Sequence, residues 1–135
     1  MPSSHATAPV SIEAALGALP ERVNADARLV QRGRHLSCTV LLRVGDEAAR
    51  LTIDAGRLER VDRGPFLMPD ASLTITAAPD DLARYREVPP PPGFNDVFAL
   101  MKRRSLSVEG DMRVFMANLL YFKGLLAHLR PEAAA

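Results

Sequence analysis

Hydrophobic and polar residues alternate along the middle of the chain. In the segment 36–44 every second position is apolar, as expected for a strand that buries one face. Turn residues follow at Gly45-Asp46, and a second turn is expected at 54–56. Five segments share this two-residue period and are predicted to be strands: 36–44, 49–53, 57–62, 73–77 and 106–108.

The apolar spacing near the N-terminus is that of a helix. Ser11 can cap a helix whose apolar residues begin at Ile12 and recur at helical spacing as far as Leu19. Pro20 is expected to end this helix, or to kink it into a second helical piece over 21–30.

Helical spacing returns after the fourth predicted strand. Pro79 can occupy the first position of a helix, with the carboxylates of Asp80 and Asp81 near its positive end. This helix is expected to end at 87–88, before a run of prolines. The next helix is predicted around four apolar residues: Phe94, Val97, Phe98 and Met101.

The last helical segment, about 112–129, is apolar nearly all round. Gly110-Asp111 precedes it as a turn and helix cap. A helix without a wide polar face must be covered on most sides, which is difficult in a small domain. A ligand tunnel, a dimer interface and a membrane surface are three ways to cover it. Gly124 weakens this helix and indicates a close approach to another element or a ligand.

Strands come first along the chain, helices later, and one strand late. This order predicts an α+β domain in which helices cover a five-stranded mixed sheet. The 135 residues suffice for one domain, which we place at 11–130. A disordered N-terminal tail over 1–10 and a frayed C-terminal tail over 131–135 are expected to flank it.

Composition shows where the bulky side chains are. Aromatic residues make up only 5% of the chain, and most of them lie with three methionines in the segment 94–122. The predicted strands are aliphatic, so an apolar ligand would find an adaptable lining in that segment. The net charge of +1 lacks the basic excess of a nucleic-acid binder, so no nucleic-acid partner is expected.

The N-terminal segment lacks the features of a secretory signal. It has no Lys or Arg before Arg22, so we expect a cytoplasmic protein. The longest apolar stretch, 112–129, contains Arg113, Lys123 and His128 and is a poor candidate for a membrane span.

Residue types that carry catalysis are present without a catalytic pattern. Cys38 stands alone, which excludes an internal disulfide framework and a cysteine zinc cluster, and its alternation places it on the core face. His5, His35 and His128 have no metal-ligand spacing. No nucleotide-binding or hydrolase motif occurs. We therefore expect no enzyme, no metal and no cofactor. The enzyme alternative would rely on three residues: Tyr85, His35 and Asp111.

The densest run of charge is Lys102-Arg103-Arg104. At the end of a predicted helix, cations interact favourably with the negative end of the helix dipole, so a solvated helix end is the simpler interpretation. The alternative is a patch that contacts anionic lipid heads or an acidic partner.

Two motifs carry a family resemblance. The segment 69–82 resembles the strand-to-helix unit "adltltlsdedl" of sterol carrier protein 2 (SCP2) sterol-binding domains. Leu106-Ser-Val-Glu-Gly-Asp-Met112 resembles their "lkveGDm" strand and turn, which opens the final helix, and the turn at 54–56 fits their "dG" hairpin. The order and spacing of these motifs match the family over about 16–129.

The resemblance implies a five-stranded sheet covered by helices around a hydrophobic tunnel. It also implies a carrier without catalysis, for sterol-like, fatty acyl or isoprenoid lipids. An alternative is an accessory protein that presents a lipid intermediate, for example in isoprenoid-quinone synthesis, to partner enzymes. Transient membrane or partner contact and a homodimer stay open. The candidate lining residues are Phe94, Phe98, Met101, Met112, Phe115, Met116, Leu119, Leu120 and Phe122.

Overall fold

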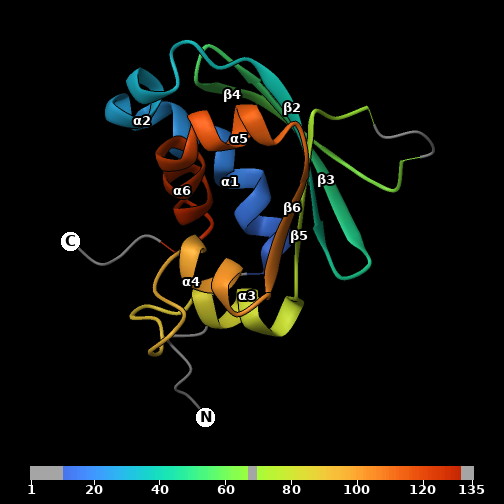
Figure 1. Ribbon diagram of the computed structural model, residues 1–135, viewed down its shortest axis with the longest axis vertical. Helices are drawn as coiled ribbons and strands as arrows, with labels where there is room; N and C mark the ends of the chain where they lie inside the picture. The colour runs from blue at the N-terminus through green and yellow to red at the C-terminus, as the bar shows by residue number, and fades with distance from the viewer. Residues whose placement is uncertain (1–10, 67–69, 132–135) are drawn as a thin grey trace.

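The computed structural model describes residues 11–66 and 70–131, which form a sheet with helices on one face (Figure 1). The predicted tails lie outside the described residues, apart from Pro131, and so does His5. The strands are β2 (Cys38–Val44), β3 (Glu47–Asp54), β4 (Arg57–Arg63), β5 (Leu73–Ala77) and β6 (Leu106–Gly110). The helices are α1 (Ile12–Ala25), α2 (Ala27–Arg32), α3 (Pro79–Tyr85), α4 (Val97–Lys102), α5 (Met112–Ala117) and α6 (Leu119–Ala127).

The sheet has the strand order β4-β3-β2-β5-β6. The β2–β5 pair is parallel and the other pairs are antiparallel, so the sheet is mixed, as predicted. Each predicted strand is present, because alternation gives every strand one apolar face. On β3, for example, Leu51 and Ile53 are buried in the core, while Arg50 between such positions is only half-buried.

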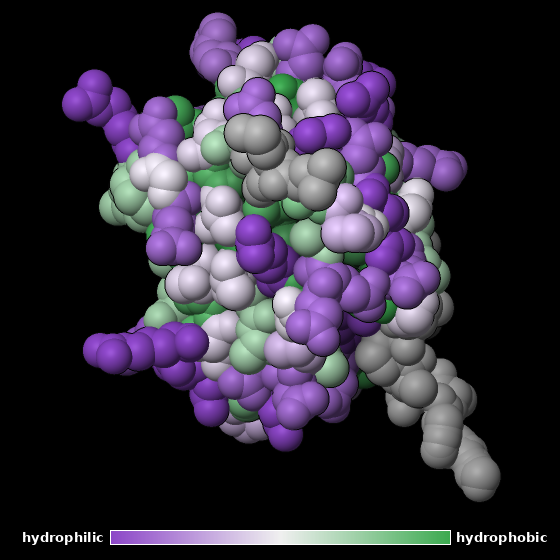
Figure 2. All heavy atoms as spheres, turned by 90° about the vertical axis from the view of Figure 1, so that its right-hand side faces the viewer, coloured by the Kyte–Doolittle hydropathy of each residue, from purple (hydrophilic) through white to green (hydrophobic). Residues whose placement is uncertain are grey.

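The opposite face of the sheet is largely hydrophilic. Figure 2 views the molecule from that side and shows mostly polar side chains with small apolar areas between them. An ion pair joins Arg50 on β3 to Asp62 on β4, with 3.5 Å between Nη2 and Oδ2. The core therefore lies between the other face of the sheet and the helices, where α1 packs against β4.

The first helix continues through Pro20, and the break predicted there lies instead at Asp26. Proline removes one helical hydrogen bond, but Leu19 and Val23 on either side of it are fully buried. Asp26 leaves the helical conformation and caps α2, accepting a hydrogen bond from the backbone N–H of Leu29 at 3.1 Å. Its other carboxylate oxygen lies 2.9 Å from Nε2 of His128 at the end of α6.

The prediction of one continuous final helix was wrong, because the chain breaks at Asn118. The Asn118 side-chain amide donates to the carbonyl of Val114 at 2.9 Å, a local bond that competes with helix continuation. The break lets α5 and α6 each bury only one side: Phe115 and Phe122 are buried, whereas Met116 is 59% exposed. Two short helices that each bury one side need less covering than a single helix that is apolar nearly all round.

Helix α3 begins at Pro79 with Asp80 and Asp81 in its first turn, as predicted, but it ends at Tyr85, earlier than expected. Asp81 accepts a hydrogen bond from the hydroxyl of Ser105, which is the main reason that its pKa lies below the ordinary value. Helix α4 begins only at Val97, with Asp96 as its cap, so the predicted helical residue Phe94 precedes it.

We expect Asp26→Ala to lower the free energy of unfolding by about 1–2 kcal/mol, because it removes a helix cap. Asp26→Asn keeps the cap and should cost less than about 1 kcal/mol, the usual value of an exposed ion pair. The His128 hydrogen bond is the main cause of the lowered pKa of Asp26. The stability that this bond gives the folded protein is therefore present above pH 3.8 and is lost as the pH falls through the lowered pKa. Urea unfolding of both variants at neutral and acidic pH measures these losses of stability. Equal losses in the alanine and asparagine variants would contradict the role of Asp26 as a helix cap.

Candidate functional site

The turn from β6 into α5 contains the Gly-Asp motif of the sequence. Gly110 has a φ of +112°, and a Cβ at this position would lie 2.3 Å from the carbonyl oxygen of Ser72. The next backbone N–H, of Asp111, donates to that same oxygen at 2.9 Å. The Asp111 carboxylate accepts from the backbone N–H of Val114 at 3.3 Å and caps α5. The motif therefore directs the chain from the edge strand back over the helical face.

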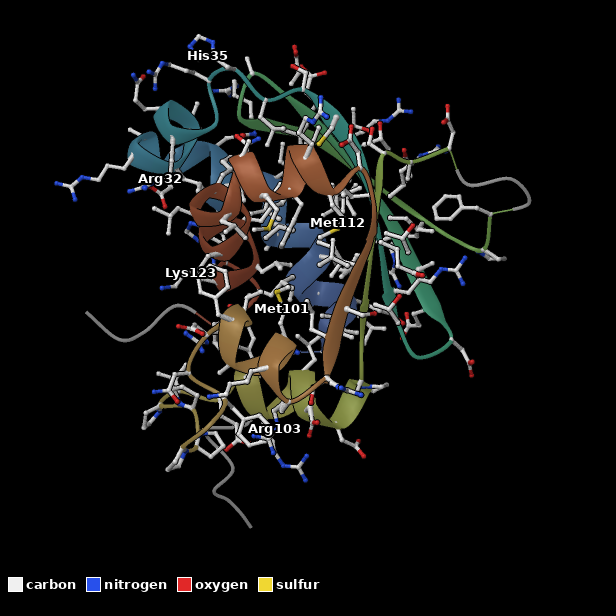
Figure 3. The ribbon with its side chains drawn as sticks, viewed as in Figure 1. Arg32, His35, Met101, Arg103, Met112 and Lys123 are labelled. Atoms are coloured by element: carbon white, nitrogen blue, oxygen red, sulfur yellow. The ribbon has the colours of Figure 1, made fainter. Side chains whose placement is uncertain are left out.

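An incompletely covered apolar region lies between β6 and the last helices. Met101 on α4 and Met112 at the start of α5 both point into the area framed by β6, α4, α5 and α6 (Figure 3). Met112 is 40% exposed, and Met101 and Val108 are partly buried against the core. We call Met101, Val108 and Met112 the apolar region. Val108 was missing from the predicted lining, although its alternation with Leu106 indicated that it faces the helices.

The predicted lining residues have three different environments. The buried ones are Phe94, Phe115 and Phe122. The partly buried ones are Phe98, Met101 and Leu119. The exposed ones are Met112, Met116 and Leu120. The structure does not test whether they line a tunnel, so the tunnel and its lining stay predictions.

A cluster of aromatic rings and glycines fixes the start of α6. Phe122 stacks on Phe115 with 5.4 Å between ring centroids and meets Tyr121 edge-on at 5.6 Å. The Tyr121 ring lies where a Cβ of Gly33 would be, and its hydroxyl donates to the carbonyl of Gly56 at 2.8 Å. Burial raises the pKa of Tyr121, so this hydroxyl keeps its proton. The cluster had no signal in the sequence, because its members are far apart along the chain.

We expect Tyr121→Phe to lower the free energy of unfolding by about 1–2 kcal/mol, because the buried carbonyl of Gly56 loses its donor. Tyr85→Phe is the matched control, since the Tyr85 hydroxyl forms no side-chain hydrogen bond within the described residues. The Tyr85→Phe variant should lose less than about 0.5 kcal/mol of unfolding free energy. Urea denaturation followed by far-ultraviolet circular dichroism compares the two, and equal losses would refute the role of the Tyr121 bond.

Gly124 marks the close contact of α6 with α2. A Cβ on Gly124 would lie 2.7 Å from Cδ1 of Leu29. The close approach predicted for this glycine is confirmed, and another helix makes it.

The candidate catalytic residues lie on different parts of the fold. Tyr85 ends α3, His35 is exposed between α2 and β2, and Asp111 caps α5 (Figures 1 and 3). Burial raises the pKa of Tyr85 to about 12, and Arg130 lies over its ring at 4.0 Å. Cys38 is partly buried against the core, and desolvation raises its pKa to about 11, so the thiol stays protonated.

Two of the surface cavities each have an arginine in their lining, and neither is lined by Met101, Val108 or Met112. One of about 500 Å³ lies between the start of α1, the β2–β3 turn and α3, and Arg86 is part of its lining. Arg86 is buried, and its Nε donates to the carbonyl of Leu129 at 2.8 Å. The other, of about 310 Å³, is a groove between Arg32 and the turn from α5 to α6.

The basic run at the end of α4 is partly engaged within the protein. The Arg103 guanidinium lies over the Phe94 ring at 4.1 Å and donates to the carbonyl of Gly93 at 3.4 Å. Lys102 and Arg104 are exposed. Within the ranges 11–66 and 70–131, no helix is long and apolar enough to cross a membrane, and no cluster of ligating side chains could hold a metal ion.

No family model matches the sequence, and no curated protein matches it. Solved structures match in fold. A crystal structure of sterol carrier protein 2 matches with a TM-score of 0.72 at 14% identity, over 89% of this chain and 96% of that one. The palmitated SCP2L2 from Aedes aegypti matches with a TM-score of 0.57 at 19% identity, over 91% of this chain and 100% of that one. A UbiJ-SCP2 ubiquinone synthesis protein matches with a TM-score of 0.55 at 20% identity, over 88% of this chain and 95% of that one. The chain therefore has the SCP2 sterol-binding domain fold that its motifs resemble.

Proposed function

We propose that this protein is a non-enzymatic carrier that binds one lipid-like apolar molecule in the apolar region. The observation that carries this proposal is the incomplete cover over Met101, Val108 and Met112, which leaves apolar surface beside a finished core. The fold supports it, since the matching structures include a sterol carrier protein and a palmitated one.

The side chains of the region suit a ligand of variable shape. Methionine is flexible and polarisable, so Met101 and Met112 can adapt to acyl, sterol-like or isoprenoid chains. Burial of about 300 Å² of apolar ligand surface would contribute on the order of 7 kcal/mol at about 25 cal/mol/Å². Immobilisation of the ligand offsets part of this, so we expect micromolar or weaker affinity with broad specificity.

A catalytic step is not part of the proposal. Tyr85, His35 and Asp111 lie on separate elements, and the raised pKa of Tyr85 makes that phenol a poor base. A hydrophobic binding site needs no group that titrates near neutral pH, so the apolar region can bind its ligand without one.

Native mass spectrometry with lipid extraction tests the proposal. The chain purified from the cells that produce it, or loaded with palmitic acid, should carry one apolar molecule per chain. The bare chain as the only species in both samples would overturn the proposal. A Phe115→Ala variant is unsuitable here, because it removes a buried aromatic ring and endangers the fold.

A second candidate function is an accessory protein that presents a lipid intermediate to partner enzymes. The match to a UbiJ-SCP2 ubiquinone synthesis protein favours it. Under this candidate the preferred ligand is an isoprenoid chain, so a polyprenylated phenol should displace bound palmitate. Preference for palmitate over the polyprenylated phenol would remove this candidate and leave the general carrier.

A further inference from the structure

Three methionines lie on α4 and α5, and solvent reaches them to different extents. Met116 is 59% exposed, and Met112, about one helical turn before it on α5, is 40% exposed. Met101 on α4 is partly buried against the core. The side chains of Met101 and Met112 point into the area framed by β6, α4, α5 and α6 (Figure 3). Met112 is therefore open to solvent and, at the same time, part of the apolar region.

The sulfur atoms of the exposed methionines are more open to oxidation than the thiol of the protein. Cys38 is the one cysteine of the chain, and it is partly buried against the core. Desolvation raises the pKa of its thiol to about 11, so little of the thiolate that peroxides attack is present at neutral pH. A thioether needs no deprotonation before it reacts, so solvent access decides which methionine is attacked. Among the described residues, we expect Met116 and Met112 to be oxidised first.

We propose that Met112 is an oxidation site through which a peroxide lowers the affinity of the apolar region for its ligand; this consequence rests on the proposed function. In the reaction with hydrogen peroxide, a sulfur lone pair forms an S–O bond as the O–O bond breaks. The departing hydroxide takes the proton of the transferred hydroxyl and leaves as water. The thioether is thus oxidised by two electrons to the sulfoxide, and the peroxide is reduced to water.

The sulfoxide oxygen changes what Met112 offers to an apolar ligand. It is a polar group that binds water, and a ligand seated over it would remove that water. The other members of the apolar region, Met101 and Val108, have side chains without a hydrogen-bond donor that could replace the water. Oxidation should therefore weaken ligand binding about fivefold or more.

Met116 undergoes the same chemistry without the same consequence. It lies outside the apolar region and is 59% exposed, so its sulfoxide would keep its water when the ligand binds. Oxidation of either methionine should also leave α5 in place. The carboxylate of Asp111 caps this helix by accepting from the backbone N–H of Val114, a bond in which neither methionine side chain takes part. Met116 is therefore a matched control on the same helix.

Hydrogen peroxide treatment of the full chain, followed by tryptic peptide mass spectrometry, shows where oxidation occurs. Trypsin places the three methionines in separate peptides: Met101 in 87–102, Met112 in 105–113 and Met116 in 114–123. Sulfoxide should form at Met116 and Met112 before it forms at Met101. Bound palmitic acid should slow the oxidation of Met112 and leave that of Met116 unchanged, because the ligand covers only the apolar region. Equal protection of both methionines, or of neither, in a protein that binds fatty acid would overturn the proposal.

Binding of a fluorescent fatty acid before and after peroxide measures the consequence, with each variant compared with its own untreated sample. Wild-type affinity should fall about fivefold or more. Met116→Leu should lose as much as the wild type, whereas Met112→Leu should keep its untreated affinity. Methionine sulfoxide reductases with a dithiol should restore the wild type, since two thiols form a disulfide and the sulfoxide oxygen leaves as water. An equal loss in Met112→Leu would overturn the proposal.

Two further outcomes separate this proposal from the carrier function and from loss of the fold. Wild-type protein that takes up no fluorescent fatty acid before peroxide is added would refute the carrier function, and the effect of oxidation with it. Uptake that stays unchanged once Met112 is oxidised would refute the oxidation proposal alone. Urea denaturation should show the same stability for oxidised and untreated protein within about 1 kcal/mol, since both oxidised methionines are exposed. Unfolding by peroxide would make the loss of binding a global effect and overturn the proposal.

Discussion

Replacement of Gly110 by alanine is expected to lower the free energy of unfolding by about 3–4 kcal/mol, a large part of the 5–15 kcal/mol typical of a domain. The φ of +112° is strained for any residue with a Cβ, which costs about 1–3 kcal/mol. The added Cβ would also lie 2.3 Å from the backbone oxygen of Ser72, so the two segments must move apart. That movement weakens the hydrogen bond from Asp111 to Ser72 at the start of α5.

Urea denaturation followed by far-ultraviolet circular dichroism measures this loss, a suitable probe because the chain has no tryptophan. Gly17→Ala is the control: Gly17 lies inside α1, and a Cβ there meets nothing within 4 Å. It should leave stability unchanged or raise it by up to about 1 kcal/mol. A Gly110→Ala protein within about 1 kcal/mol of the wild type would show that β6 and α5 do not depend on this close approach.

The second large effect concerns the ligand. Met101→Gln with Met112→Gln should weaken binding of an apolar ligand about 30-fold or more, because each amide loses water without gaining a partner. The free energy of unfolding should change by less than about 1 kcal/mol, since Met112 is 40% exposed and Met101 is only partly buried. Displacement of a fluorescent fatty acid, with urea denaturation alongside, measures both quantities.

Met101→Leu with Met112→Leu is the matched control, because leucine keeps the volume and apolar character of methionine. Its affinity should stay within about threefold of the wild type. Unchanged affinity in the glutamine variant, with the fold intact, would place the ligand elsewhere and remove these residues from the site.

The strands could be predicted because alternation is a local signal that burial then confirms, as in Leu51 and Ile53 on β3. The helix breaks could not be predicted, because they depend on partners distant in sequence or on local competition. Asp26 stops α1 and meets His128, 102 residues later. Asn118 ends α5 through its own side chain, and a helical wheel over 112–129 does not include that possibility.

The same break limited the prediction of the candidate site. In a continuous helix, Phe115, Met116 and Leu119 would share a face with the residues that follow them. Because the chain turns at Asn118, Phe115 enters the core while Met116 faces solvent. The motif at Gly110-Asp111 was read correctly as a turn and cap, since glycine and aspartate act there through backbone geometry that sequence reveals.

Photo-crosslinking with a fatty acid that carries a diazirine near the end of its chain tests the central claim most directly. The account predicts saturable labelling with one lipid per chain, mapped by peptide mass spectrometry to the segments that contain Met101, Val108 and Met112. It also predicts that unlabelled palmitate competes for this labelling and that the variant with glutamine at both methionines loses it. Labelling that does not saturate, or that maps only to the cavity beside Arg86, would contradict the account.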